Sequence, residues 1–233
     1  MELRYAKALV TGGSSGIGLE TARMLRERGA RVAISARGED RLTKAAEEIK
    51  ASAIPADVSD EEQVVRMVNR AIDLLGGLNV LINNAGFGAF APLQELTLEK
   101  MEDVFRTNVF GAAMVAREAT KHFVQQDYGN IINIGSTAAY KGFPGGSAYV
   151  GSKFALSGLT ECWRAELRKH NIRVMQINPS EVQTGFAKTA GHEQQLSERK
   201  LRSEEIGHAI ISLLEMDDRG FVTDLAVWAT NPD

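Results

Sequence analysis

The sequence predicts an α/β fold: a doubly wound parallel sheet of about seven strands with helices on both faces. Two observations support this. Short β-branched apolar runs alternate with segments of helical periodicity along the whole chain, which is typical of right-handed βαβ units. A glycine-rich turn also joins the first apolar run to the first helical segment. The 233 residues suffice for one sizeable core and are few for two, so we expect a single domain over 1–233.

The expected elements follow these patterns in chain order. The first helix ends at Gly29, and the third keeps apolar residues at a 3.6-residue period until the Gly76-Gly77 pair. We expect strands at 6–11, 31–36, 53–56, 80–82, 130–134, 172–177 and 221–229. We expect helices at 16–28, 39–51, 60–75, 97–126, 147–170 and 204–216. The polar segment 185–203 is either a mobile lid or a long surface loop.

Composition argues against several other classes of protein. Hydrophobic residues make up 44% and charged residues 24%, as in ordinary globular chains. The 27 Lys and Arg against 30 Asp and Glu give no basic excess, so we expect no nucleic-acid partner. The single Cys162, expected to be buried and inert, allows no internal disulfide and favours a reducing compartment.

The sequence gives no sign of a metal centre or a membrane segment. The four histidines lack the spacing of zinc ligands. No apolar run approaches the ~18 residues of a membrane span, and residues 1–10 do not resemble a signal peptide. We therefore expect a cytoplasmic protein.

The turn at 11–18, TGGSSGIG, is a candidate phosphate site. Gly12, Gly16 and Gly18 stand where a strand must turn sharply into a helix, and glycine permits positive φ and close approach to the backbone. The unpaired N–H groups of the helix N-terminus suit a pyrophosphate. The alternative is a plain glycine-rich turn, but its place after the first strand favours a Rossmann dinucleotide site.

The end of the second strand bears on cofactor choice. NAD sites usually place a carboxylate there to bind the ribose 2′-hydroxyl. This chain has Ser35-Ala36-Arg37 instead, and a guanidinium can bind a phosphate, so NADP(H) is favoured and NAD(H) remains possible. The alternative is that Arg37 is a solvated charge and Glu39 or Asp40 reaches the ribose.

Tyr149 and Lys153 lie four residues apart at the start of an expected helix, so they share a face. A phenol has a pKa near 10, and a nearby ammonium is expected to lower it. A Tyr-x-x-x-Lys spacing also arises by chance, so the pair needs its neighbours.

With those neighbours, the chain resembles the short-chain dehydrogenase/reductase family in its common single-domain form. The matching segments are 11–18, Asp57-Val58, 83–86, Asn108, 133–136, Pro144-Gly145, 149–153 and Asn178-Pro179. They occur in family order over about residues 5–184, and together they are specific although each is weak alone. One departure is Gly135, which stands where the family commonly has a second serine.

The resemblance implies a catalytic group of Asn108, Ser136, Tyr149 and Lys153. Tyr149 would be the general acid or base, Ser136 would hold the substrate oxygen, and Lys153 would hold the nicotinamide ribose. Asn108 would bind a water that links Lys153 to solvent. Cofactor contacts are implied for Gly12, Ser14, Ser15, Gly16, Ile17, Gly18, Arg37, Asp57, Val58, Asn84, Ala85, Gly86, Tyr149, Lys153, Pro179 and Thr184.

Within these implied contacts, Asp57 would accept from the adenine amino group, and Thr184 would contact the nicotinamide carboxamide. Asn84 would lie beside the adenosine ribose and steady the centre of the sheet. Taken singly, these polar residues are as well explained as turn, cap or buried amide groups.

The expected activity is reversible carbonyl–alcohol conversion with NADP(H), in the direction of reduction. Its substrate is a small carbonyl or alcohol compound, with a 3-oxoacyl thioester, a ketone, an aldehyde and a sugar all left open by the sequence. A homo-oligomer (dimer or tetramer) is implied by the resemblance. Four phenylalanines either line an apolar pocket or anchor loops in the core, and the sequence favours neither alternative. They are Phe87, Phe90, Phe143 and Phe186. The alternatives are a non-catalytic dinucleotide sensor and an isomerase or dehydratase on the same scaffold.

Overall fold

The computed structural model describes residues 1–186 and 197–231. In this part of the chain one parallel sheet has the strand order β3-β2-β1-β4-β5-β6-β7. The strands are β1 (Lys7–Thr11), β2 (Arg31–Ala36), β3 (Ser52–Pro55), β4 (Val80–Asn83), β5 (Gly129–Ile134), β6 (Ile172–Pro179) and β7 (Asp224–Val227). The predicted doubly wound fold is therefore confirmed. The order reverses between β1 and β4, where such sheets open a crevice for ligands.

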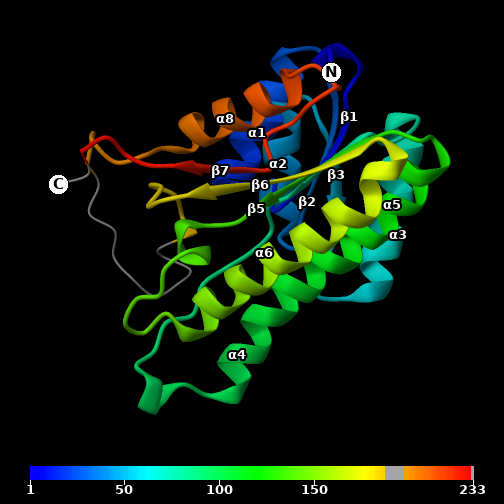
Figure 1. The fold of residues 1–233 in the computed structure, drawn as a ribbon. Helices are drawn as coiled ribbons and strands as arrows, with labels where there is room; N and C mark the ends of the chain where they lie inside the picture. The colour runs from blue at the N-terminus through cyan, green and yellow to red at the C-terminus, as the bar shows by residue number, and fades with distance from the viewer. Residues whose placement is uncertain (187–196, 232–233) are drawn as a thin grey trace.

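Helices cover both faces of the sheet (Figure 1). They are α1 (Gly16–Glu27), α2 (Glu39–Ile49), α3 (Glu61–Leu75), α4 (Leu98–Phe105), α5 (Ala112–Gln125), α6 (Ser147–Leu167) and α8 (Ser203–Glu215). One apolar core joins α1, α2 and α8 to the sheet, and a second joins α3, α5 and the end of α6 to the other face. Every residue of β5 and β6 is buried, as expected for central strands covered on both sides.

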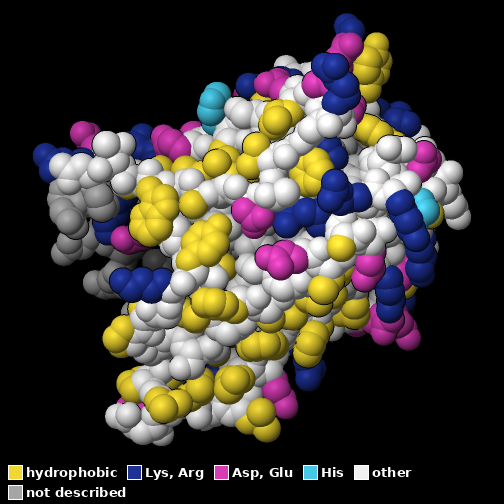
Figure 2. Space-filling model, viewed as in Figure 1, with side chains coloured by type: hydrophobic (Ala, Val, Ile, Leu, Met, Phe, Trp, Pro, Cys, Tyr) yellow, Lys and Arg dark blue, Asp and Glu magenta, His cyan; other side chains and the backbone are white. Residues whose placement is uncertain are grey.

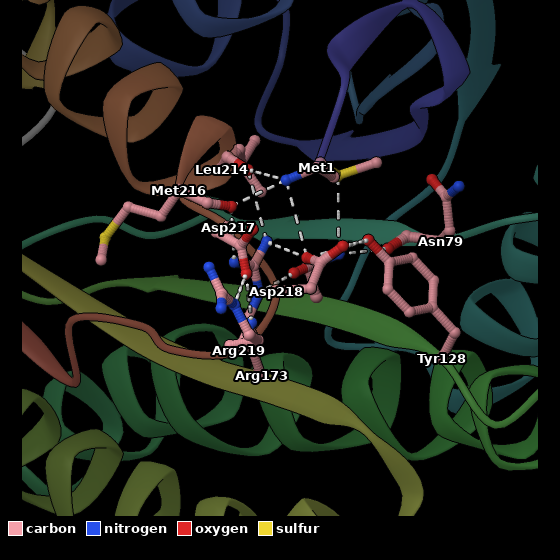
Figure 3. A network of polar contacts seen from close by, with 10 residues as sticks. Met1, Asn79, Tyr128, Arg173, Leu214, Met216, Asp217, Asp218 and Arg219 are labelled. Atoms are coloured by element: carbon pink, nitrogen blue, oxygen red, sulfur yellow. Dashed lines mark hydrogen bonds and ion pairs between the residues drawn. The ribbon is translucent and has the colours of Figure 1, made fainter.

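Helix α8 is tied to the end of the sheet opposite the crevice (Figure 3). The buried guanidinium of Arg173, at the start of β6, donates to Asn130 Oδ1 at 2.6 Å and to the Leu214 carbonyl at 3.3 Å, and it pairs with Asp218 at 3.2 Å. These partners compensate the charge for its loss of hydration. Because α8 packs on α1, this anchor also supports the helix that begins at the glycine turn.

The structure corrects the prediction of one continuous helix over 97–126. Helix α4 ends at Phe105, and a π-helical turn, η3 (Arg106–Gly111), leads into α5. A Cβ on Gly111 would lie 2.9 Å from the Val58 carbonyl oxygen, so the chain passes unusually close to the loop after β3 here. Turns of this kind are rare and often found at functional sites.

Two smaller expectations also change, and a third falls mostly on residues that the structure does not describe. The last strand covers only Asp224–Val227, because its flanks leave the sheet. Cys162, expected to be buried, is exposed on α6. Most of the segment 185–203, the predicted lid or loop, lies outside the described residues. Its described end is held by Gln183, which exchanges hydrogen bonds of 2.6 and 2.7 Å with Ser197.

Candidate active site

A cavity of about 1180 Å³ opens at the carboxyl ends of the central strands. All of the predicted site residues line it except Gly18 and Asn108. The lining members are Gly12, Ser14, Ser15, Gly16, Ile17, Arg37, Asp57, Val58, Asn84, Ala85, Gly86, Ser136, Tyr149, Lys153, Pro179 and Thr184. Residues separated by up to 172 positions (12 to 184) therefore meet at one edge of the sheet, as parallel topology requires.

The glycine turn lies against the amide of Asn84. Gly12 has φ +65° and Gly16 has φ +56°, the left-handed region that glycine tolerates. Asn84 Nδ2 donates to the carbonyls of Thr11 at 2.9 Å and Gly12 at 3.2 Å. A Cβ on Gly18 would lie 2.5 Å from that nitrogen, so Gly18 serves this packing and does not line the cavity.

The N-terminus of α1 fits an anionic group. Its N-cap, Ser15, makes no side-chain capping hydrogen bond, so the first-turn N–H groups remain available. Ser14, Ser15 and Gly16 all line the cavity there. Positive φ, absent Cβ groups and a helix dipole together make a cradle suited to the diphosphate of a dinucleotide.

Cationic side chains line the cavity beyond β2. Arg37 is 70% exposed, with Nη1 3.9 Å from Asp57 Oδ2, and Arg41 lines the same wall. The competing carboxylates, Glu39 and Asp40, lie in the first turn of α2 and do not line this cavity. The sequence interpretation missed Arg41. Its position four residues after Arg37, at the start of a helix, could have predicted that it also faces the cavity.

Asp57 also has an ordinary structural role, in the turn before α3 and not as the cap of that helix, which is Asp60. Its Oδ1 accepts from the Ser59 backbone at 2.9 Å and from the Ser59 hydroxyl at 2.7 Å. Oδ2 faces Arg37. One oxygen shapes the turn after β3 while the other faces the cavity.

Ser136, Tyr149 and Lys153 meet where β5 ends and α6 begins. Tyr149 lies in the first turn of α6, and Lys153 lies one turn later with Nζ 5.6 Å from the centre of the Tyr149 ring. The Lys153 ammonium is buried and donates to the Ile134 carbonyl at 2.8 Å. Ser136 Oγ accepts from the Ala138 backbone at 3.1 Å and hydrogen-bonds the Tyr149 hydroxyl.

Burial controls the protonation of this pair. It raises the pKa of Tyr149, against a smaller lowering effect of the Ser136 hydrogen bond. It lowers the pKa of Lys153 to about 8. The expectation that Lys153 lowers the pKa of Tyr149 below its usual value is therefore wrong for this structure, because loss of hydration by the phenolate dominates. Tyr149 holds its proton at neutral pH.

Asn108 lies behind the cavity wall, inside the π-helical turn. Its Oδ1 accepts from the Phe87 backbone at 3.0 Å, and its Nδ2 donates to the Phe87 carbonyl at 2.9 Å and to Ser152 Oγ at 3.1 Å. A Cβ on Gly86 would lie 3.0 Å from Asn108 Oδ1 and 3.9 Å from Lys153 Nζ. The buried Asn108 side chain thus fixes the loop after β4 and adjoins the lysine.

A buried amide, Asn178, orients the Ser136 loop. Asn178 Oδ1 accepts from the Ser136 backbone at 3.1 Å and from Gln176 Nε2 at 2.7 Å. Its Nδ2 donates to the Tyr140 hydroxyl at 2.6 Å. A Cβ on Gly135 would lie 2.1 Å from Asn178 Oδ1, so the position that commonly holds serine in the resembled family is filled here by the Asn178 amide.

The remaining predicted contacts lie near the same wall. Thr184 Oγ1 accepts from the Phe186 backbone at 3.2 Å, and its side chain faces Gly16. Pro179 ends β6 at the cavity. The sequence interpretation missed Lys141 and Trp228, which also line the cavity but sit in loops with no recognisable spacing. All four phenylalanines with open assignments line it too, which favours the pocket alternative.

Other kinds of site find no support in the described residues. Across 1–186 and 197–231 no three His, Cys, Asp or Glu side chains gather as a metal site would require. In the same part of the chain, no helix has the length and apolar character to cross a bilayer.

Comparisons with known proteins agree with this geometry. A family model described as short chain dehydrogenase matches residues 6–195. An oxidoreductase of Thermotoga maritima is 31% identical over 232 residues, covering 93% of this chain and 91% of the relative. The oxidoreductase YxnA of Bacillus subtilis is 37% identical over 193 residues, covering 79% of this chain but only 54% of the length of that relative.

A solved structure shows the same architecture. The alcohol dehydrogenase of the archaeon Thermococcus sibiricus, complexed with 5-hydroxy-NADP, superposes with a TM-score of 0.89 at 27% identity, covering 97% of this chain and 98% of the other.

Proposed function

The chain belongs to the short-chain dehydrogenase family, and from that premise we propose that it is an NADP(H)-dependent reductase that converts a carbonyl group to an alcohol, with Tyr149 as proton donor. The observation that carries the proposal is the position of the half-buried Tyr149 beside Ser136 and Lys153 in the cavity, where loss of hydration raises its pKa and keeps it protonated. A protonated phenol is suited to donate to a carbonyl oxygen that gains negative charge.

The cavity offers groups for each part of the cofactor. The turn from Gly12 to Gly18 and the N-terminus of α1 would hold the diphosphate. Arg37 would bind the ribose 2′-phosphate, with Arg41 adding positive charge. Asp57 and Val58 would contact the adenine. Cavity-lining arginines and the absence of Glu39 and Asp40 from that wall support NADP(H) over NAD(H).

The other end of the cavity would hold the reacting groups. The nicotinamide, when bound, supplies a hydride to the carbonyl carbon. Tyr149 gives its proton to the carbonyl oxygen, so ketone, NADPH and one proton become alcohol and NADP⁺. The Ser136 hydroxyl holds that oxygen as it gains charge. Lys153 would bind the nicotinamide ribose, and Asn108 positions the Phe87 loop beside the lysine.

Substitution of Tyr149 by phenylalanine tests the proposal. Tyr149→Phe removes the proton donor and leaves the glycine turn and Arg37 intact, so we expect NADPH-dependent reduction to fall by about 10²–10⁴-fold while the NADPH dissociation constant stays within about twofold. NADPH absorbance measures the expected loss of turnover, and calorimetry measures the NADPH dissociation constant. Retained turnover would contradict the role of Tyr149. Tight NADPH binding by wild type with no carbonyl class reduced would favour the sensor alternative.

We also propose that copies of the chain associate through the α4–α6 side. Hydrophobic side chains gather there on the face shown in Figure 2, and Leu98, Phe110 and Phe154 are exposed large apolar residues on α4, η3 and α6. Contiguous exposed apolar surface commonly marks an interface between subunits. Sedimentation equilibrium should give a dimer or tetramer, and a monomer at micromolar concentration would contradict this.

A further inference from the structure

Aromatic rings enclose the reactive end of the cavity. The Phe90 ring lies 5.7 Å from the Tyr149 ring in an edge-on arrangement, and the Phe186 ring lies 5.5 Å from it at 57°. Phe143 adjoins Phe90 at 5.8 Å. These separations lie in the range that aromatic pairs favour. Two phenyl rings therefore flank the phenol, and Phe143 extends this wall beyond Phe90. The three rings, called the ring cage below, all line the cavity.

The backbone is shaped to bring these rings together. A Cβ on Gly88 would lie 2.9 Å from the Phe90 ring and 3.0 Å from the Phe186 ring. A Cβ on Gly146 would lie 2.7 Å from the Phe143 ring. Two loops distant in sequence thus carry glycine at the points where the rings press on the main chain. Packing against backbone limits the motion of the rings and preorganises the cage.

The carboxylates that line the described cavity already face cationic side chains. Of the carboxylates that line the described cavity, Asp57 lies at the Arg37 end and Glu181 pairs with Lys200 at 2.8 Å. The exposed Lys141 is on the loop after Tyr140, and Lys153 donates to the Ile134 carbonyl. The hydroxyl groups of Ser136 and Tyr149 are suited to hold a single carbonyl oxygen beside the phenyl groups of the cage.

We propose, on the basis of the proposed function, that the substrate is a neutral ketone bearing an apolar ring, or the matching secondary alcohol, with the ring held in the cage of Phe90, Phe143 and Phe186. A rigid ring presents faces and edges to the phenyl groups and loses little conformational freedom on binding. A sugar would lose the hydration of several hydroxyl groups without replacement hydrogen bonds from phenyl walls.

The cage also explains the state of the proton donor. Burial, the largest influence on Tyr149, raises its pKa and keeps the proton available for the ketone oxygen. A ring-bearing substrate completes that burial by excluding water from the cage. The same phenyl groups would therefore provide both the affinity for the ring and the protonated phenol.

A substrate series on the NADPH-loaded enzyme tests the assignment. The probes are acetophenone, cyclohexyl methyl ketone, a linear methyl ketone of the same carbon number, butanone, a ketohexose and acetoacetyl coenzyme A. We expect kcat/KM for the two ring ketones to exceed that for the ketohexose and the thioester by tenfold or more, and that for the linear ketone by several-fold. A preference for the sugar, the thioester or the linear chain would overturn the proposal.

Cage variants separate ring binding from general damage. Phe90→Ala and Phe186→Ala should each lower kcat/KM for cyclohexyl methyl ketone about tenfold and that for butanone by less than threefold. If the substitutions merely misplaced Tyr149, kcat/KM would fall equally for both substrates. Tyr5→Ala removes an exposed aromatic side chain outside the cavity and should leave both values unchanged. If the ratio of kcat/KM for cyclohexyl methyl ketone to that for butanone stayed unchanged in both cage variants, the proposal would be overturned.

A binding measurement distinguishes failure of the substrate class from failure of the reaction. Tyr149→Phe loaded with NADPH should still bind cyclohexyl methyl ketone in calorimetry, with Phe186→Ala in the same background weakening it about tenfold. If wild type reduces no carbonyl yet this binding pattern holds, the reductase proposal fails and the cage assignment stands. If wild type reduces other carbonyls and the ring ketone does not bind, the cage assignment fails alone.

Discussion

The contact between Gly135 and Asn178 predicts a strong effect from a single methyl group. Gly135 follows β5 directly, and a Cβ there would lie 2.1 Å from Asn178 Oδ1 and 2.8 Å from Gln176 Nε2. Asn178 is fully buried and makes hydrogen bonds to Ser136, Gln176 and Tyr140. Gly135→Ala therefore requires the Asn178 side chain to leave this arrangement.

The size of the effect follows from the bonds that must break. Three neutral hydrogen bonds at ~1 kcal/mol each give a loss of about 3 kcal/mol in the free energy of unfolding. That is a large part of the ~5–15 kcal/mol that stabilises a typical protein. At this chain length, about 2–4 °C per kcal/mol corresponds to a fall in Tm of about 6–12 °C. Catalysis should fall as well, since the Ser136 backbone loses its partner.

Urea unfolding of the single and double variants measures this coupling. In Gly135→Ala/Asn178→Ala the new methyl occupies the space that the amide vacates, and the end of the flexible Gln176 side chain, freed from its Asn178 partner, can shift away from it. The double variant should therefore match Asn178→Ala alone to within about 0.5 kcal/mol. Gly220→Ala, where a Cβ meets nothing within 4 Å, is the control and should change stability by less than about 0.5 kcal/mol. Simple addition of the two single losses would refute the steric argument, as would a Gly135→Ala variant as stable as the control.

Two further predictions concern charge. Arg37→Asp exchanges a phosphate-binding cation for a carboxylate that can accept from a ribose hydroxyl, so the ratio of kcat/KM for NADPH to that for NADH should fall at least about tenfold; an unchanged ratio would show that Arg37 does not hold the phosphate. Burial lowers the pKa of Lys153 to about 8, whereas the unfolded side chain keeps its proton to about pH 10.4. From pH 8 to about 10 the unfolded state thus binds more protons, and the free energy of unfolding of wild type should rise relative to Lys153→Met by on the order of 2 kcal/mol. A difference that stays constant or falls in chemical denaturation across that window would contradict this.

The sequence predicts those parts of the molecule that depend on periodicity and on strand ends. Strand and helix alternation fixes a parallel sheet, and parallel topology brings every carboxyl-terminal strand end to one edge. Ser136 after β5 and Tyr149 at the start of α6 could therefore be placed in one crevice without knowledge of any contact. The glycine turn could also be predicted, because few residues other than glycine adopt the positive φ found at positions 12 and 16.

Features that depend on packing across the sheet could not be predicted from the sequence. The meeting of Gly135 with Asn178 joins residues 43 positions apart (135 to 178) and leaves no periodic signal. The π-helical turn at 106–111 interrupts a stretch that the sequence predicts as one helix, and it lies where Gly111 comes close to Val58, a contact between residues 53 positions apart. The exposure of Cys162 likewise follows from which side of α6 faces the sheet.

The pKa of Tyr149 illustrates why the identity of neighbours alone is insufficient. A lysine one helical turn away suggests an acidified phenol, and that argument considers only the charge of Lys153. In the folded chain Lys153 is buried and Tyr149 is half-buried, and loss of hydration opposes the charged form of each, so it raises the pKa of the phenol and lowers that of the ammonium. A protonated phenol is a donor ready for a carbonyl, whereas oxidation of an alcohol would first require its ionisation. The apolar surroundings therefore favour reduction at neutral pH, and oxidation should gain relative to reduction as the pH rises.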